Sequence, residues 1–204
     1  GAGIVSWWNV LLQQRVSLIM MLTKELERGI PKADPYWPAG DAPGSEETFG
    51  PFRVLLERLE SIPNVPEIVV RHLSVTSTLP GNAAPHKITQ LQFRGWPDHG
   101  IPDSTTSFRA MMTYMESHPV SEAPIIVHCS AGIGRTGTLI GYYALRRLLE
   151  RQLLHDKSVM EVVAAMKQSR RGMVQRLDQY IFMYQCLSED VRAATESQSI
   201  VKGA

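Results

Sequence analysis

Cysteine is scarce in this sequence, which contains only Cys129 and Cys186 among its 204 residues. Two cysteines cannot build the disulfide framework of a small secreted domain, and they fit a reducing compartment, so we expect a cytoplasmic protein. No apolar run approaches the ~20 residues that a membrane helix needs. The start of the sequence shows no signal peptide either. We therefore expect no membrane segment in this chain.

A strong net charge is also absent, because 21 lysines and arginines face 20 aspartates and glutamates. The formal charge of +1 leaves no overall field that would attract nucleic acid. Apolar residues at 44% and charged residues at 20% are ordinary for a globular protein. The length fits one domain, which we expect over residues 1–190, followed by a polar tail over 191–204. We expect a monomer with no metal and no cofactor.

The most informative stretch is Pro-Ile-Ile-Val-His-Cys-Ser-Ala-Gly-Ile-Gly-Arg-Thr-Gly-Thr, centred on Cys129. Residues 125–127 are a β-branched run that predicts a buried strand. After the cysteine come Gly132 and Gly134, and then a helical pattern that starts near Leu139. A strand, a glycine loop and a helix N terminus turn backbone N–H groups toward one point, where the helix dipole favours negative charge. The pattern predicts an anion site the size of a phosphate.

Two side chains make this site reactive. The loop amides, the helix N terminus and Arg135 all favour the thiolate form of Cys129 over the thiol. Arg135 offers a planar fork that binds two oxyanions at once, which lysine cannot do. A thiolate beneath a bound phosphate is placed for in-line attack on phosphorus. The alternative is an inert buried cysteine, which is common for free cysteine but leaves the glycines and the arginine unexplained.

This stretch resembles the signature loop of the cysteine-based protein tyrosine phosphatases, His-Cys-(x)5-Arg-Ser/Thr-Gly. Further stretches resemble other motifs of the tyrosine-specific branch in the same order. They are Met21–Gly29 with Lys32 and Tyr36–Pro38, then Trp96–Gly100, and then Gly172–Tyr180. The resemblance covers about residues 7–187. It implies a phosphatase catalytic domain of the α/β class, with a highly twisted mixed central sheet flanked by helices.

The resemblance implies hydrolysis of phosphotyrosine in two steps. Cys129 attacks phosphorus while Asp98 protonates the tyrosine oxygen, which leaves a phosphocysteine. Gln175, helped by Gln179, then positions a water for attack, with Asp98 as the base. From their spacing alone these two glutamines would be surface amides. Thr136 steadies the departing thiolate, and the groups that hold the phosphoryl oxygens are Arg135 and the amides of Ser130, Ala131, Gly132, Ile133 and Gly134.

The local sequence Trp-Pro-Asp-His-Gly also supports Asp98 as an acid. Pro97 and Gly100 bracket it on a loop of limited freedom. Because the phenol of tyrosine has a pKa near 10, its departure at neutral pH gains from a proton donor. The alternative is an ordinary turn aspartate. We assign no role to His99.

Four residues are expected to support the site. By resemblance Glu27 pairs with Arg135, and Lys32 lies near the acid loop. The alternative for Glu27 and Lys32 is that both are surface residues of a connecting hairpin. Trp96 can anchor the acid loop, and His128 precedes the nucleophile.

The sequence departs from the family in one respect. It has no Lys-Asn-Arg-Tyr segment, with which tyrosine-specific members build a deep pocket wall, and it lacks the opening helices and strands. We therefore expect an N-terminally incomplete or unusually short member with exposed sheet edges. Two alternatives stay open, a dual-specificity phosphatase with a shallow pocket and a phosphotyrosine-binding module that is catalytically weak or inactive. The expected partners are phosphotyrosine-containing proteins.

Periodicity predicts further elements around these motifs. Strands are expected at 68–77 and 87–96, whereas 52–61 fits a helix or a strand. A first helix is predicted to contain Val10, Leu11, Gln14 and Leu18, and a second helix is predicted to be capped by Ser104 or Thr105. A capping box at Ser158–Glu161 opens a helix that ends before Gly172. The last helix is predicted to bury Tyr180, Ile181, Tyr184 and Leu187 and to fray beyond Glu189.

Overall fold

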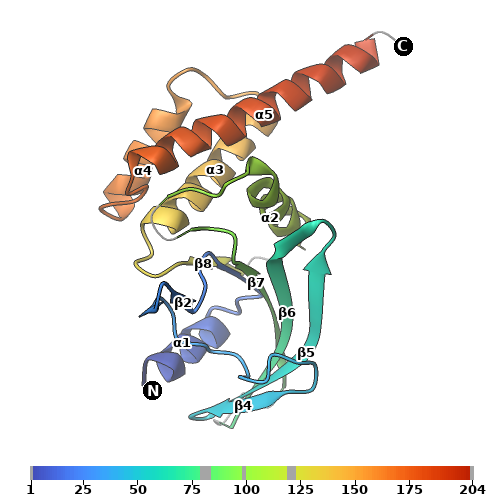
Figure 1. The fold of residues 1–204 in the computed structure, drawn as a ribbon, viewed down its shortest axis with the longest axis vertical. Coiled ribbons are helices and arrows are strands. Elements are labelled where there is room, and N and C mark those ends of the chain that lie inside the picture. The colour runs from blue at the N-terminus through green and yellow to red at the C-terminus, as the bar shows by residue number, and fades with distance from the viewer. Residues whose placement is uncertain (1, 79–83, 98–99, 119–122, 203–204) are drawn as a thin grey trace.

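The structure is a computed structural model that describes residues 2–78, 84–97, 100–118 and 123–202, with side chains through Glu196. It confirms the predicted mixed α/β single domain (Figure 1). In chain order the elements are α1 (Ala2–Gln13), β1 (Leu18–Met21), β2 (Leu26–Glu27), β3 (Ile30–Pro31), β4 (Glu46–Phe49), β5 (Phe52–Ile62), β6 (Val65–Ser77), β7 (His86–Phe93), α2 (Thr105–Ser117), β8 (Ile126–His128), α3 (Gly134–Glu150), α4 (Ser158–Ser169) and α5 (Leu177–Lys202).

The central sheet has the strand order β4-β5-β6-β7-β1-β8. Strands β5, β6 and β7 pair antiparallel, whereas β1 runs parallel to both of its neighbours, β7 and β8. In the described part of the chain β4 and β8 are the edges of this sheet. Strand β8 ends directly before Cys129, so the sheet fixes where the loop of this cysteine begins.

Strand β1 is buried on both faces and separates two hydrophobic cores. Leu18 and Met20 face a core built with α2, α3 and α5, whereas Ile19 and Met21 face a core built with α1. Successive residues of a strand point to opposite faces, so a strand covered on both sides needs an apolar residue at every position. Figure 1 shows α1 on one side of the sheet and α3, α4 and α5 on the other.

The ambiguous stretch at 52–61 forms strand β5. Phe52, Val54 and Leu56 are buried and alternate with exposed Arg53, which is the pattern of a strand with one covered face. The predicted strands at 68–77 and 87–96 are confirmed as β6 and β7, although β7 ends at Phe93. The predicted start of α2 is also confirmed, since the side chain of its N-cap residue accepts a hydrogen bond from the backbone N–H two positions on.

The buried face predicted for the last helix is confirmed at Leu187 and in part at Tyr180, which is half-buried against the core between α3 and α4, and it is wrong at the other two positions. The exposed side chains include Ile181 and Tyr184, and the core instead takes Phe182, Met183 and Cys186. The ring of Phe182 packs edge-on against Phe108 with centroids 5.2 Å apart. A tyrosine at the surface keeps its hydroxyl group in water, whereas phenylalanine has no polar group to hydrate. The helix therefore turns its phenylalanine inward.

Other local predictions are corrected by the fold. Strand β8 is half-buried rather than buried, because β1 is its only described neighbour. Helix α3 begins at Gly134 rather than near Leu139. The capping box at Ser158 is wrong: Lys157 is the N-cap, and the Ser158 hydroxyl instead accepts a hydrogen bond from the backbone N–H of His155 at 2.9 Å.

Both ends of the chain also differ from expectation. Helix α1 ends at Gln13, so Leu18 belongs to β1, and Val10 is exposed while Leu11 is buried. Arg15 has a φ of 53°, a left-handed conformation that stops the helix. Helix α5 continues to Lys202 where fraying is predicted. The division of the chain into a domain over 1–190 and a tail over 191–204 stays a prediction.

Within the described residues no helix combines the length and the apolar character needed to span a bilayer. The same residues contain no group of three or more His, Cys, Asp or Glu side chains arranged to hold a metal ion.

Candidate active site

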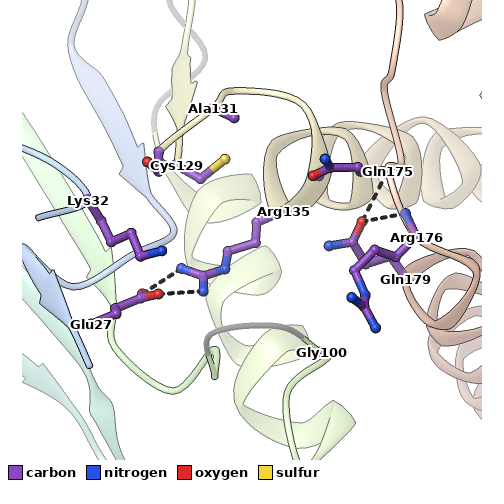
Figure 2. Close-up of a pocket in the computed structure, with 11 residues that line it drawn as sticks. Glu27, Lys32, Gly100, Cys129, Ala131, Arg135, Gln175, Arg176 and Gln179 are labelled. Carbon is purple, nitrogen blue, oxygen red and sulfur yellow. Dashed lines mark hydrogen bonds and ion pairs between the residues drawn. The ribbon is translucent and has the colours of Figure 1, made fainter. Parts of the chain in front are cut away.

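A pocket of about 210 Å³ lies where the loop after β8 meets the β2–β3 hairpin, the segment before α2 and the segment before α5 (Figure 2). It brings together residues that are far apart in the sequence. Its lining residues are Glu27, Lys32, Gly100, Cys129, Ser130, Ala131, Gly134, Arg135, Gln175, Arg176 and Gln179. The sequence predicts all of these at the site except Arg176 and Gly100, which is expected only to bracket the acid loop.

Cys129 leaves β8 at the floor of this pocket. The Thr136 hydroxyl donates a hydrogen bond to its Sγ at 3.2 Å. Gly132 has a φ of +69°, a left-handed conformation that glycine adopts without strain and that turns the chain back toward α3. Ile133, the N-cap residue of α3, provides no side-chain cap. The N–H groups of the first turn of α3 are therefore left for an anion, which the helix dipole also favours.

Arg135 is fixed in the pocket by two elements. Its Nη1 donates to Glu27 Oε1 at 2.6 Å and its Nη2 to Glu27 Oε2 at 2.8 Å, so the expected contact between these residues is present and bidentate. Nη1 also donates to the carbonyl oxygen of Leu22 at 3.1 Å. Figure 2 shows the guanidinium held between Glu27 and the loop of Cys129.

Glu27 itself is buried at the end of β2. Burial alone raises the pKa of its carboxyl, but the hydrogen bonds from Arg135 and Thr23 and the charge of Arg135 outweigh it, and the pKa is lowered. The Thr23 hydroxyl donates to Glu27 Oε1 at 2.7 Å. The carboxylate therefore stays charged at neutral pH and keeps the guanidinium in one orientation.

The flanks of the acid loop lie against the same pocket, while Asp98 and His99 lie outside the described residues. Nη2 of Arg135 donates to the carbonyl oxygen of Pro97 at 3.1 Å. The indole N–H of Trp96 donates to the carbonyl oxygen of Gly100 at 2.9 Å. Trp96 is buried, which fits its expected role as an anchor of this loop. The first contact places Pro97 beside the guanidinium, and the second joins the start of the loop to its end.

The segment before α5 supplies the two glutamines. Gln179 Oε1 accepts hydrogen bonds from the backbone N–H groups of Gln175 at 3.1 Å and Arg176 at 3.2 Å, so it fixes the turn that carries Gln175. Both glutamine side chains lie against Gly134, where an added Cβ would be 3.0 Å from Gln179 Nε2 and 3.3 Å from Gln175 Oε1. Both amides line the pocket, although Gln175 is exposed, as its spacing suggests, and only Gln179 is buried.

Two arginines that the sequence analysis did not single out complete the surroundings. Arg170 Nη2 donates to the carbonyl oxygen of Ala131 at 3.2 Å and so braces the loop after β8 from outside. Arg176 lies at the rim of the pocket and pairs with Asp178 at 3.1 Å. The contact of Arg170 has no local sequence signal, because it depends on how the segment after α4 folds back on the loop. The pair of Arg176 and Asp178 is local, but it does not by itself place Arg176 at the pocket.

Gly137 lies in the first turns of α3, where even the methyl group of alanine should lower the stability of the protein. A Cβ at this position would lie 2.4 Å from the backbone nitrogen of Val174 and 3.2 Å from the carbonyl carbon of Met173. Backbone cannot move aside cheaply, so we expect Gly137→Ala to destabilise the protein by about 1–3 kcal/mol in urea unfolding. It should also lower turnover, because the displaced segment carries Gln175.

The matched control for this substitution is Gly3→Ala, also within a helix. No atom lies within 4 Å of a Cβ added there. Its unfolding free energy should stay equal to that of the unmodified chain or rise slightly, as expected for alanine in a helix. Equal stabilities of Gly137→Ala and Gly3→Ala would contradict the close contact.

Comparison with known proteins agrees with this geometry. The family model described as protein-tyrosine phosphatase matches residues 3–189. Tyrosine-protein phosphatase 2 of Dictyostelium discoideum is 34% identical over 200 residues, which cover 96% of this chain and 51% of that protein. The chain therefore spans about half the length of that curated relative.

Solved structures give the same fold. The crystal structure of a protein tyrosine phosphatase of Trypanosoma cruzi matches with a TM-score of 0.83 and 40% identity, covering 93% of this chain and 65% of that one. A structure of PTPN18 in complex with HER2 phosphopeptides matches with a TM-score of 0.79 and 28% identity, covering 91% of this chain and 62% of that one.

Proposed function

Because the chain belongs to the protein-tyrosine phosphatase family, we propose that it hydrolyses phosphotyrosine in proteins through a phosphocysteine intermediate. The observation that carries this proposal is the arrangement of Cys129 beneath the uncapped first turn of α3, with Arg135 beside it. The pocket provides a nucleophile, an oxyanion site and a fixed guanidinium in one place. These are the parts that transfer of a phosphoryl group to sulfur requires.

In the first step the Cys129 thiolate attacks phosphorus along the line of the leaving tyrosine oxygen. Negative charge is spread over the equatorial phosphoryl oxygens, where Arg135 and the loop amides stabilise it. Asp98 gives its proton to the departing phenolate, which leaves as tyrosine. The bond between phosphorus and sulfur forms as the bond between phosphorus and the tyrosine oxygen breaks.

In the second step water attacks the phosphocysteine and releases inorganic phosphate. Asp98, now a carboxylate, takes the proton of this water. Gln175 orients the water, and Gln179 holds the turn that carries Gln175. Thr136 donates its hydrogen bond to the sulfur as the thiolate leaves. This hydrogen bond favours the charged form of the leaving group.

The proposal includes the setting in which the protein acts. The substrates are phosphotyrosine-containing proteins, which the phosphopeptides bound to PTPN18 support. Cys129 and Cys186 are both free thiols, which suits a reducing compartment, and we place the protein in the cytoplasm as a monomer that acts in phosphotyrosine signalling.

The direct test is hydrolysis of a phosphotyrosine peptide by this chain, followed by phosphate release. The matched substrate is the same peptide with phosphoserine in place of phosphotyrosine. We expect release from the phosphotyrosine peptide at a rate at least about 100-fold higher, a difference of roughly 2.7 kcal/mol in the activation free energy. Comparable rates would favour a dual-specificity phosphatase. Binding of the phosphotyrosine peptide without release would favour a binding module.

The role of Asp98 predicts a dependence on the leaving group. Asp98→Ala should slow the hydrolysis of aryl phosphates with poor leaving groups by about 10²–10⁴-fold, the usual contribution of a general acid. Aryl phosphates with activated leaving groups should slow much less, because they leave without a proton. Steady-state kinetics over a series of substituted phenyl phosphates measures this slope. Equal slowing across the series would count against Asp98 as the acid.

A further inference from the structure

A line of buried polar side chains runs behind the active site, from the middle of the sheet to Cys129. It begins at Arg71 on β6, whose side chain is 0% exposed. The Nε and Nη2 atoms of Arg71 donate to the two carboxylate oxygens of Asp41 at 2.6 and 2.8 Å. Its guanidinium also stacks on the ring of Trp37, 4.5 Å from the centroid. The guanidinium is therefore fixed in place.

The remaining nitrogen of Arg71 sets the orientation of Gln90 on β7. Nη1 of Arg71 lies 3.1 Å from Gln90 Oε1. A guanidinium can only donate, so the atom of Gln90 that faces it is the amide oxygen. The amide nitrogen is thereby turned to the other side, where it donates to the hydroxyl oxygen of Tyr36 at 2.9 Å.

The hydroxyl of Tyr36 then has one proton to donate and two acceptors near it. His128 Nε2 lies 2.8 Å away and the sulfur of Met21 lies 3.9 Å away. Thioether sulfur is a weak acceptor, so the proton goes to the imidazole. Burial raises the pKa of Tyr36, so this hydroxyl keeps its proton throughout the physiological range.

His128 Nε2 is therefore an acceptor, and the single proton of the neutral ring is on Nδ1. This nitrogen lies 3.4 Å from the carbonyl oxygen of Cys129. Burial lowers the pKa of His128, which keeps the ring neutral at pH 7, and the backbone contact at Cys129 opposes that shift only in part. The ring of Trp7 packs edge-on against the imidazole, with centroids 5.4 Å apart, and holds its plane.

We propose that Arg71 and Gln90 are positioning residues of this active site, which hold His128 as the neutral Nδ1–H tautomer through the hydroxyl of Tyr36. The donors are Arg71, Gln90 and Tyr36, and each fixes which atom of the next residue is free to donate. The direction is set at Arg71, because a guanidinium can donate hydrogen bonds but cannot accept them. The tautomer places an N–H beside the Cys129 carbonyl at the start of the nucleophile loop. The effect on turnover rests on the proposed function, whereas the tautomer itself does not.

The substitution that tests this is Gln90→Glu, which replaces the amide nitrogen by an oxygen of the same size. The carboxylate still accepts from Arg71, but it now also accepts from Tyr36. The Tyr36 oxygen then offers its lone pair to His128, whose Nε2 must become the donor. We expect the ring proton to move from Nδ1 to Nε2.

The matched control is Gln92→Glu, on the same strand. Gln92 Oε1 also accepts from Arg71 Nη1, at 2.9 Å, but its amide nitrogen donates to the carbonyl oxygen of Thr23 and not to Tyr36. This variant has the same change of charge beside the same arginine, away from the line to His128. Its imidazole should keep the proton on Nδ1.

The readout is long-range ¹H–¹⁵N NMR of the histidine ring nitrogens at pH 7, where protonated and unprotonated nitrogens resonate far apart. The unmodified chain should show His128 with the proton on Nδ1, and a proton on Nε2 there would overturn the proposal without any variant. A His128 tautomer that is the same in Gln90→Glu and the unmodified chain would overturn it too. The expected shift occurs even if this chain hydrolyses nothing.

Kinetics tests the positioning role separately. With p-nitrophenyl phosphate we expect kcat of Gln90→Glu to fall by about tenfold or more, since a small misplacement of a reacting group is costly. KM should change less than kcat, because the groups that hold the phosphate are untouched. A changed tautomer with unchanged kcat would show that the line has no part in turnover.

Discussion

Replacing Cys129 with serine should abolish the hydrolysis of phosphotyrosine peptides and leave their binding within a few-fold of its original strength. A serine hydroxyl is not ionised near neutral pH, so it cannot attack phosphorus at a measurable rate in this site. The groups that hold the phosphate, Arg135 and the N–H groups of the first turn of α3, are unchanged by the substitution. Phosphate release measures the first effect, and calorimetric titration with the peptide measures the second.

The control for this substitution is the other cysteine. Cys186 is buried on α5, and burial raises the pKa of its thiol, so it stays protonated and unreactive. Cys186→Ala should keep kcat and KM near their original values, although it removes buried volume and lowers stability. Residual turnover in Cys129→Ser above that of the uncatalysed reaction would contradict the proposed nucleophile.

The second large effect is expected from Arg135→Lys. The guanidinium donates to both oxygens of Glu27 and to the carbonyl oxygens of Leu22 and Pro97, which leaves its Nε–H for a phosphoryl oxygen. An ammonium group is a point charge that cannot serve these partners in one plane. We expect kcat/KM on phosphotyrosine peptides to fall by about 10²–10³-fold, the usual cost of removing one preorganised oxyanion donor. Steady-state kinetics at a fixed pH measures the loss.

Arg147→Lys provides the comparison on the same helix. Arg147 pairs with Glu150 at the surface, where both side chains are nearly half exposed. Charge is preserved in both substitutions, so any difference between them reflects geometry in the pocket. We expect Arg147→Lys to leave kcat/KM unchanged, and a comparable loss in both variants would contradict the assignment of Arg135.

The reactive loop could be predicted from the sequence because its parts are local. The β-branched run, the glycines, Cys129 and Arg135 lie within one strand-loop-helix unit, whose geometry follows from backbone preferences. The partner of the arginine is 108 residues away in the chain. Only the resemblance to a family predicts that Glu27 pairs with Arg135, because no periodicity links a carboxylate on a hairpin to a distant loop.

The register of α5 could not be predicted for a different reason. Its first half has apolar or aromatic residues on nearly every side, so the 3.6-residue period does not identify one buried face. The choice of Phe182 over Tyr184 depends on what α2 and the acid loop present to it. Arg71 is a similar case, since a charged residue inside a strand is ordinarily exposed and its burial depends on Asp41 and Trp37.

The most direct measurement of the central claim is alkylation by iodoacetate at pH 7, with Cys129→Ser as the blank. Iodoacetate should label Cys129 and leave the buried Cys186 unlabelled, and inorganic phosphate should slow the labelling because it occupies the anion site around the sulfur. Labelling of Cys129 that phosphate leaves unchanged would contradict a nucleophile beneath the bound phosphate.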